Sequence, residues 1–218
     1  MKNNKWFLFV VVISLTDCIL PFFLALFYLG YNYMNMVLSA LGSEDSPVRA
    51  IYNIWMLCLG VSFIFIGLHV YRSYESVAKY SRTCLLLITL GYAVFDCINS
   101  GFFSIGDSKN MVTIPQMIHG YGSVIGCTLF TFSGLIAAVM LWKSYRNAAL
   151  LLLLDFIVCL LAFTIFVASE NIGADSNGIV KIMTYEGLWQ RISFLFMYVP
   201  HIVLCMITLR KKVNLGGK

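Results

Sequence analysis

Long apolar runs alternate with short polar stretches along the whole chain. A helix needs about 20 predominantly apolar residues to span a bilayer, and the runs of that length predict six transmembrane helices. Their approximate bounds are 6–29, 51–71, 84–103, 114–142, 148–168 and 188–209. No linker, low-complexity tract or block of charge divides the chain, so we expect residues 1–218 to form a single integral membrane domain. The predicted fold class is all-α, a six-helix transmembrane bundle.

The composition agrees with a membrane protein and narrows the classes of partner. The chain is 60% hydrophobic and 11% charged, with a mean hydropathy of +0.85, whereas soluble domains carry about 25% charged residues. The net charge is +5, but no basic helix or aromatic–basic platform is present, so we expect no nucleic-acid partner. The seven cysteines lie in apolar runs and form no C-x-x-C pair, which indicates buried side chains rather than disulfides.

The distribution of lysine and arginine predicts the orientation of the helices. Short cytoplasmic loops of membrane proteins are enriched in these residues. With a cytoplasmic N-terminus, the outer side carries only Arg49, Lys109, Lys181 and Arg191, and the inner side carries the remaining lysines and arginines. We therefore predict that both termini are cytoplasmic and that this is a multi-pass protein of the cell membrane. The longer loops then lie outside, so the outer face is expected to carry the function.

Polar side chains in the third and fourth predicted helices indicate a buried site near the outer face. Asp96, Asn99 and Ser100 are spaced at i, i+3 and i+4, so they share one helix face. In the next helix a polar stripe recurs every three or four residues, at Gln116, His119, Ser123, Cys127 and Thr131. Lipid cannot satisfy such groups, so we expect protein, water or a ligand opposite them.

Gly122 and Gly126 form a G-x-x-x-G motif on the fourth predicted helix. Small residues at this spacing let the backbones of two helices approach closely in a membrane. Because five other helices of the same chain are available, we expect this contact within the bundle rather than in a dimer. The sequence leaves the oligomeric state open.

Several polar residues at a similar depth near the outer surface define the predicted ligand site. They are Asn53, Asp96, Ser100, His119, Gln190 and Arg191. We interpret them as the lining of an outward-facing polar cavity that recognises a lipid headgroup or another small amphiphile. Gln190 and Arg191 would contact the polar or anionic group, while Asp96 and His119 would set the local charge. Membrane lipids are the expected partners.

Two other functions are compatible with the same residues. An intramembrane enzyme would use Asp96 and His119 as an acid–base or metal-binding pair, although no G-x-S-x-G or H-E-x-x-H motif is present. A small proton-coupled transporter would use Asp17 or Asp155 as a proton relay, because carboxylates inside spanning helices are costly and usually face a cavity or a partner. The sequence contains no metal-binding motif and leaves the cofactor, if any, undetermined.

The chain resembles the prokaryotic six-helix family catalogued as domain of unknown function 998. The matching segments are Ser39-Ala40-Leu41-Gly42, Asn53 with Gly60, Gly101-Phe102-Phe103 with Asp107, His119, and Gly187-Leu188-Trp189-Gln190-Arg191. They occur in the family's order and extend from Ser39 towards the C-terminus. That family tends to have proline where this chain has Ser104. The resemblance implies the same six-helix topology and the same outer residues, and it implies no established activity.

Overall fold

The structure is a computed structural model that describes residues 2–76, 79–105, 111–169, 172 and 177–215. Within these residues every regular element is helical, and six spans are long and apolar enough to cross a membrane. The first, second, fifth and sixth spans are α1 (Lys2–Ala25), α2 (Arg49–Ser73), α7 (Arg146–Ser169) and α9 (Glu186–Leu215). The third consists of α3 (Lys79–Gly91), η2 (Tyr92–Ile98) and α4 (Asn99–Phe102). The fourth consists of α5 (Ile114–Thr131) and α6 (Ser133–Leu141). The predicted all-α, six-helix fold is confirmed.

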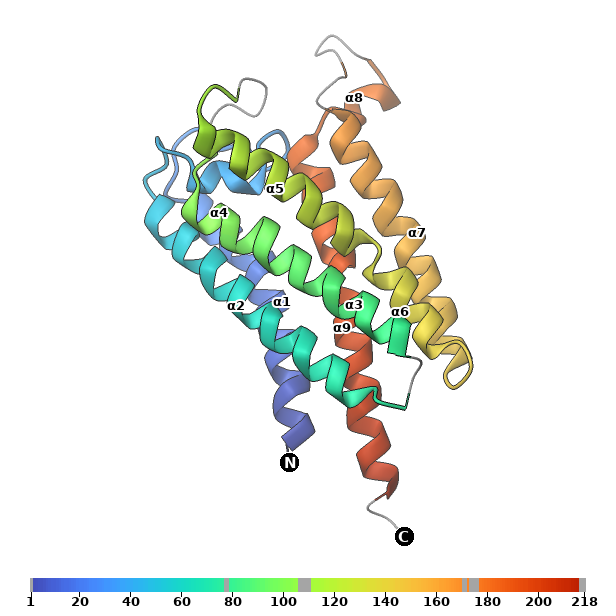
Figure 1. Ribbon diagram of the computed structural model, residues 1–218. Coiled ribbons are helices and arrows are strands. Elements are labelled where there is room, and N and C mark those ends of the chain that lie inside the picture. The colour runs from blue at the N-terminus through green and yellow to red at the C-terminus, as the bar shows by residue number, and fades with distance from the viewer. Residues whose placement is uncertain (1, 77–78, 106–110, 170–171, 173–176, 216–218) are drawn as a thin grey trace.

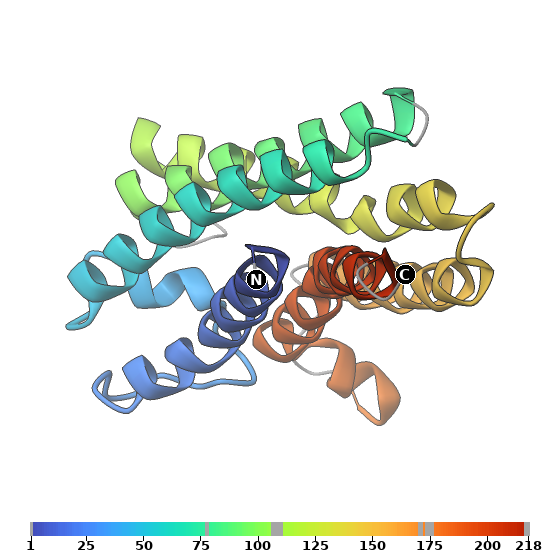
Figure 2. The same ribbon diagram turned by 90° about the horizontal axis from the view of Figure 1, so that it is seen from below.

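The six spans form one bundle with both termini at the same end (Figure 1). We call the opposite end, which carries η1 (Leu38–Gly42) and α8 (Ile179–Met183), the distal end. Seen along the bundle, α2 and α3 run across one side, whereas α1, α9 and α7 lie on the other (Figure 2). Large apolar side chains such as Leu8, Leu154 and Leu195 are more than half exposed on the outside, as expected for helices that face lipid.

A cluster of aromatic rings fills the centre of the bundle. Tyr92 stacks on Phe130 with ring centres 4.0 Å apart, and Phe63 packs edge-on against both rings at 5.3 and 5.4 Å. Tyr198 of α9 lies parallel to Phe63 at 5.5 Å. Offset and edge-on arrangements of this kind are the favourable ones for aromatic pairs. The cluster therefore joins α2, the third and fourth spans and α9 just below the cavity described in the next section.

Glycines set the close approach of the fourth span to the third. A Cβ placed on Gly126 would lie 2.7 Å from the backbone nitrogen of Asp96, and one on Gly122 would lie 2.8 Å from the carbonyl oxygen of Phe95. Both glycines therefore pack directly on the backbone of η2. The expectation that the G-x-x-x-G motif makes a contact within the bundle is confirmed.

The third span differs from the uninterrupted helix that the sequence predicts. Residues Tyr92–Ile98 form a π-helix between α3 and α4. A π turn holds more residues than an α turn, so it rotates the positions that follow it, and such turns occur frequently at functional sites. Here the π-helix contains Asp96 and Tyr92, which both line the distal cavity.

The fourth span is also interrupted, at Phe132, where the sequence predicts one helix over 114–142. Phe132 has φ −78° and ψ −3°, and its N–H bonds to Leu129 as in a tighter turn. Beyond the break, α6 packs closely along α7, whereas α5 contacts α7 at few positions. The break therefore directs α5 away from α7 towards the distal end (Figure 1).

The first helix ends at Ala25 rather than at Leu29, as the sequence predicts. The N–H groups of Leu26 and Phe27 bond three residues back, to Phe23 and Leu24, so the helix tightens and unwinds. Gly30 then takes φ +87°, a backbone conformation that glycine adopts without steric strain. The chain turns back over the bundle through residues 31–37 and leads into η1.

Candidate functional site

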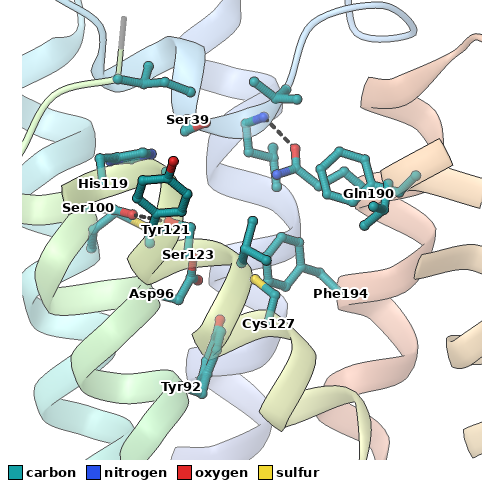
Figure 3. A pocket seen from close by; sticks show the side chains of 18 of the residues that line it. Ser39, Tyr92, Asp96, Ser100, His119, Tyr121, Ser123, Cys127, Gln190 and Phe194 are labelled. Carbon is teal, nitrogen blue, oxygen red and sulfur yellow. Dashed lines mark hydrogen bonds between the residues drawn. The ribbon is translucent and has the colours of Figure 1, made fainter. Parts of the chain in front are cut away.

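A cavity of about 300 Å³ lies in the distal half of the bundle, and all six spans contribute to its wall (Figure 3). Its polar residues are Asp17, Ser39, Tyr52, Tyr92, Asp96, Ser100, Gln116, His119, Tyr121, Ser123, Cys127 and Gln190. Its apolar wall includes Met56, Val124, Phe163, Phe166, Val167 and Phe194. We call this space the distal cavity. It brings together four groups predicted from the sequence, namely Asp96, Ser100, His119 and Gln190.

The polar stripe of α5 forms one side of the distal cavity. Gln116, His119, Ser123 and Cys127 line it, whereas Thr131 donates its hydroxyl to Cys127 O within the same helix. The start of α5 is fixed by a capping box, in which Thr113 Oγ1 accepts from the backbone N–H of Gln116 and Gln116 Oε1 accepts from that of Thr113. The capping box uses the side-chain oxygen Oε1 of Gln116. The side-chain amide nitrogen Nε2 is then the polar atom of this residue that is left to bind a ligand.

The third span supplies the wall next to this stripe. Tyr92, Asp96 and Ser100 follow one another at intervals of four residues and all line the distal cavity. The hydroxyls of Ser100 and Ser123 are 3.3 Å apart, and the Asp96 carboxyl faces Ser123 and Cys127 (Figure 3). Asn99 leaves the face it was predicted to share, because its amide donates to the backbone oxygens of Ile118 and His119.

His119 is buried and its tautomer is set by its neighbour. Nδ1 lies 2.9 Å from the carbonyl oxygen of Phe103, which can only accept, so Nδ1 carries the proton. The neutral ring then has an acceptor at Nε2, on a side chain that lines the distal cavity. No hydrogen bond joins His119 to Asp96 within the described part of the chain. The enzyme hypothesis therefore has its two groups in one cavity, each with other partners.

Gln190 and Arg191 bind the segment that turns back over the bundle. Gln190 Oε1 accepts from the backbone N–H of Leu38 at 2.6 Å, and Gln190 lines the distal cavity. Arg191 donates to the carbonyl oxygens of Tyr33, Met36 and Gly187, at 2.7–3.2 Å. Arg191 is not among the described residues of the cavity wall. Its contact with a ligand therefore stays a prediction from the sequence, and its observed partners belong to the chain itself.

Tyr31 completes the binding of Arg191. Its hydroxyl accepts from the guanidinium at 2.7 Å and donates to Val37 O at 3.0 Å. Burial raises the pKa of Tyr31, an effect that exceeds the opposing influence of the Arg191 charge. The phenol therefore stays protonated at neutral pH and can act as donor and acceptor at once.

Two other positions singled out in the sequence lie beside the distal cavity rather than in its wall. The side-chain oxygen of Asn53 is buried against η1, 2.5 Å from where a Cβ on Gly42 would be placed. Ser104, at the position where the resemblance leads one to expect proline, accepts from Arg49 at 2.6 Å, a bond that a proline side chain has no group to make. Asp107 lies outside the described residues.

Asp17 forms the floor of the distal cavity within a chain of hydrogen bonds. Its two carboxyl oxygens accept from Trp55 Nε1 at 2.7 Å and from the Tyr198 hydroxyl at 2.6 Å. The Tyr92 hydroxyl is 2.8 Å from that of Tyr198, so Tyr92 donates to Tyr198. Asp155 lies elsewhere, on α7 beside Gly134 of α6. The two candidate relay acids thus do not share a cavity among the described residues.

Asp17→Asn is expected to lower the free energy of unfolding by about 1–3 kcal/mol. The new amide nitrogen would face one of two donors, so a buried hydrogen bond is lost and a donor is left unpaired. Thermal unfolding in detergent measures the loss. Asp155→Asn is the matched control, because the described residues offer that carboxyl no hydrogen bond, and equal losses in the two variants would show that the Asp17 bonds carry no stability.

The distal cavity opens sideways, between α5 and α7. Of the residues in its wall, Tyr121 and Val124 on α5 are 62% and 56% exposed, and Val167 on α7 is 46% exposed. These exposed wall residues lie on α5 and α7, two helices that contact each other at few positions. Asp96 and His119 are buried inside, whereas Tyr121, Val124 and Val167 are exposed at the opening, an arrangement that suits a molecule with a polar and an apolar end.

No group of three or more histidine, cysteine, aspartate or glutamate side chains arranged to hold a metal ion is found among the described residues. The pairs that the sequence suggested as ligands therefore lack a third protein ligand in this part of the chain. Structural and catalytic zinc sites ordinarily use three or four protein ligands. The polar chemistry of the distal cavity therefore rests on its hydrogen-bonding groups.

Six apolar spans around a part-polar cavity define the chain as a multi-pass membrane protein. It belongs to the family described as protein of unknown function (DUF998), whose model matches residues 11–207. Comparison with curated proteins and with solved structures finds no match. The membership confirms the resemblance noted in the sequence.

Proposed function

We propose that this protein binds a lipid or another small amphiphile in the distal cavity, with the polar group inside and the apolar chain between α5 and α7. The observation that carries the proposal is the distribution of wall residues. Asp96, Ser100, His119 and Ser123 gather at one side, and Phe163, Phe166 and Phe194 at the other. Ligand sites typically combine such an apolar lining with a few polar groups that fix orientation.

The lateral opening supports a ligand that arrives from the membrane. Tyr121 and Val124 lie on the exposed face of a spanning helix, where their neighbours are expected to be lipid chains. An amphiphile entering between α5 and α7 would leave its chain in lipid, so only the polar group would need to be desolvated. The basic residues gather at the end with the termini, which favours a bundle in the cell membrane with the distal cavity outside.

Val124→Trp is expected to reduce the amphiphile retained by the purified protein at least about tenfold, because the indole would fill the opening of a cavity of about 300 Å³. Native mass spectrometry of protein released gently from its own membrane measures the retained mass. Ile125→Trp is the matched control, since Ile125 is a neighbouring exposed residue of α5 outside the described wall. Equal retention by both variants, or none by the unmodified protein, would contradict the proposal.

A further inference from the structure

The charge of the distal cavity differs in sign from that of the chain. The chain has 15 lysines and arginines against 10 aspartates and glutamates. Among the described residues that line the distal cavity, however, the charged types are aspartates alone, Asp17 and Asp96. An acidic interior in a basic chain is not a consequence of composition. It favours a positively charged or hydrogen-bond-donating group inside.

His119 gives an independent reason to expect a donor. The side chain is 3% exposed, and its Nδ1 is bound to the Phe103 carbonyl. Its Nε2 has no hydrogen-bond partner within the described residues, and the neutral ring has a lone pair there. Nε2 is not one of the fully buried side-chain atoms without a partner in the described part of the chain, so this acceptor is open to the distal cavity. A ligand group that satisfies it must carry an N–H or O–H.

The two acids of the distal cavity are not equivalent. Both oxygens of Asp17 already accept hydrogen bonds, from Trp55 and Tyr198. Asp96 is 5% exposed, and the donors that it faces in the described part of the chain are the weak thiol of Cys127 and the shared hydroxyl of Ser123. Asp96 is therefore the carboxyl that a bound cation would contact, on the same side of the cavity as His119 (Figure 3).

A second hollow of about 480 Å³ adjoins the distal cavity at the distal end. It shares the wall residues Val37, Ile105 and Gln116 with the distal cavity, and it is also lined by Glu44, Asp45 and Glu186. We call it the acidic groove. Its described lining contains no lysine or arginine. Clefts lined by one sign of charge raise the local concentration of the opposite ion, so this groove extends the preference of the distal cavity to the surface.

The glutamines at the distal edge complete the pattern. Gln190 and Gln116 each have their side-chain oxygen bound to backbone N–H groups, of Leu38 and of Val112 and Thr113. Both residues line the distal cavity, and with the oxygens bound in this way each side chain has its amide nitrogen left as a neutral donor. They suit a hydroxyl or carbonyl oxygen a few bonds from the cationic group, and as neutral groups they do not offset the acids.

We propose that the distal cavity selects amphiphiles whose polar group is a primary ammonium over those with a neutral or anionic group. A primary ammonium has three N–H donors, enough for Asp96, the Nε2 of His119 and one hydroxyl. Bonds between ionised partners are about twice as strong as neutral ones. This inference rests on the proposed function, because it names the chemical class of ligand for the same cavity.

The test uses three probes with one chain length: dodecylamine, dodecanol and dodecanoate. The protein is held in nanodiscs of phosphatidylcholine and offered equimolar mixtures at pH 7, and the bound masses are counted by native mass spectrometry. We expect bound dodecylamine to exceed each of the other two roughly tenfold. Asp96→Asn should bring the ratio near one, while Asp155→Asn, which neutralises a buried acid outside the described wall, should leave it unchanged.

A second variant keeps the test decisive if Asp96→Asn does not fold. Glu44 and Asp45 are exposed, so Glu44→Gln with Asp45→Asn should fold normally. We expect that pair to reduce the preference for dodecylamine about twofold at low salt and less at high salt, because exposed charges are screened. A preference for dodecanoate, or equal binding of all three probes, overturns the inference and leaves amphiphile binding in place. If the unmodified protein binds none of the three probes in larger amount than Val124→Trp does, both the ammonium preference and the proposed amphiphile binding are overturned.

Discussion

Arg191→Lys is expected to lower the free energy of unfolding by about 3 kcal/mol, although the substitution keeps the positive charge. The guanidinium reaches three backbone carbonyls and the Tyr31 hydroxyl with two of its nitrogens. Its carbon also lies 5.6 Å from the centre of the Phe22 ring, within the range of cation–π attraction. A lysine ammonium is a single point on a flexible stem and cannot serve partners in those directions together.

The loss is measured as a fall in melting temperature in detergent, roughly 6–12 °C for a chain of this size. Arg49→Lys is the matched control at the same end of the bundle, because the side chain of Arg49 makes one hydrogen bond within the described residues, to Ser104, and an ammonium can also make it. It should change the melting temperature little. If the two lysine variants have the same melting temperature, the forked geometry of the Arg191 guanidinium is not what holds the segment that turns back over the bundle.

Gly126→Ala is expected to destabilise the protein by about 2 kcal/mol. The added Cβ would lie 2.7 Å from the Asp96 nitrogen and 2.8 Å from its Cβ. Overpacking of this kind costs about 1–3 kcal/mol, while alanine gains up to about 1 kcal/mol of helix propensity over glycine. Because the obstructing atoms belong to η2 and its Asp96, the loss prevails. Displacement of Asp96 should also weaken amphiphile retention.

Gly67→Ala provides the control on another helix pair. A Cβ there would meet side-chain atoms of Thr89 and Leu86 at 3.2–3.3 Å, about half an ångström farther than the contacts of Gly126, so the neighbours need to move by only a few tenths of an ångström. The propensity gain should then offset most of the strain, leaving stability nearly unchanged. The measurement is the free energy of unfolding of both alanine variants under the same conditions. Similar losses of stability in the two variants would mean that contact with the η2 backbone is not what makes Gly126 sensitive.

Features that recur at helical spacing were predictable. The stripe from Gln116 to Cys127 needs only the α-helical period to identify its cavity face, and Gly122 and Gly126 need only their small size. Tyr92 was missed as a cavity residue, although it stands four residues before Asp96 just as Ser100 stands four after it. An apolar neighbourhood made its ring resemble ordinary packing, so the hydroxyl was overlooked.

Features that depend on distant pairing were not predictable. The bonds of Arg191 join residues about 158 positions apart, and no local pattern indicates that Tyr33 and Met36 return to α9. Asn53 has the depth predicted for it but faces η1, a short 3₁₀ helix whose position is set by tertiary contacts. The π-helix could not be predicted either, because the mostly apolar sequence of Tyr92–Ile98 does not distinguish a π-helix from an α-helix.

The interruption at Phe132 separates two parts of one span that face different neighbours. The half below it, α6, is committed to its long contact with α7, so substitutions there act on stability. The half above it carries the cavity wall and borders lipid on its other side, so residues such as Tyr121 and Val124 are little constrained by packing. Substitutions at these two positions are therefore expected to alter the opening of the distal cavity with little change in the free energy of unfolding, whereas Gly122 and Gly126 of the same helix pack on η2 and do not share this freedom.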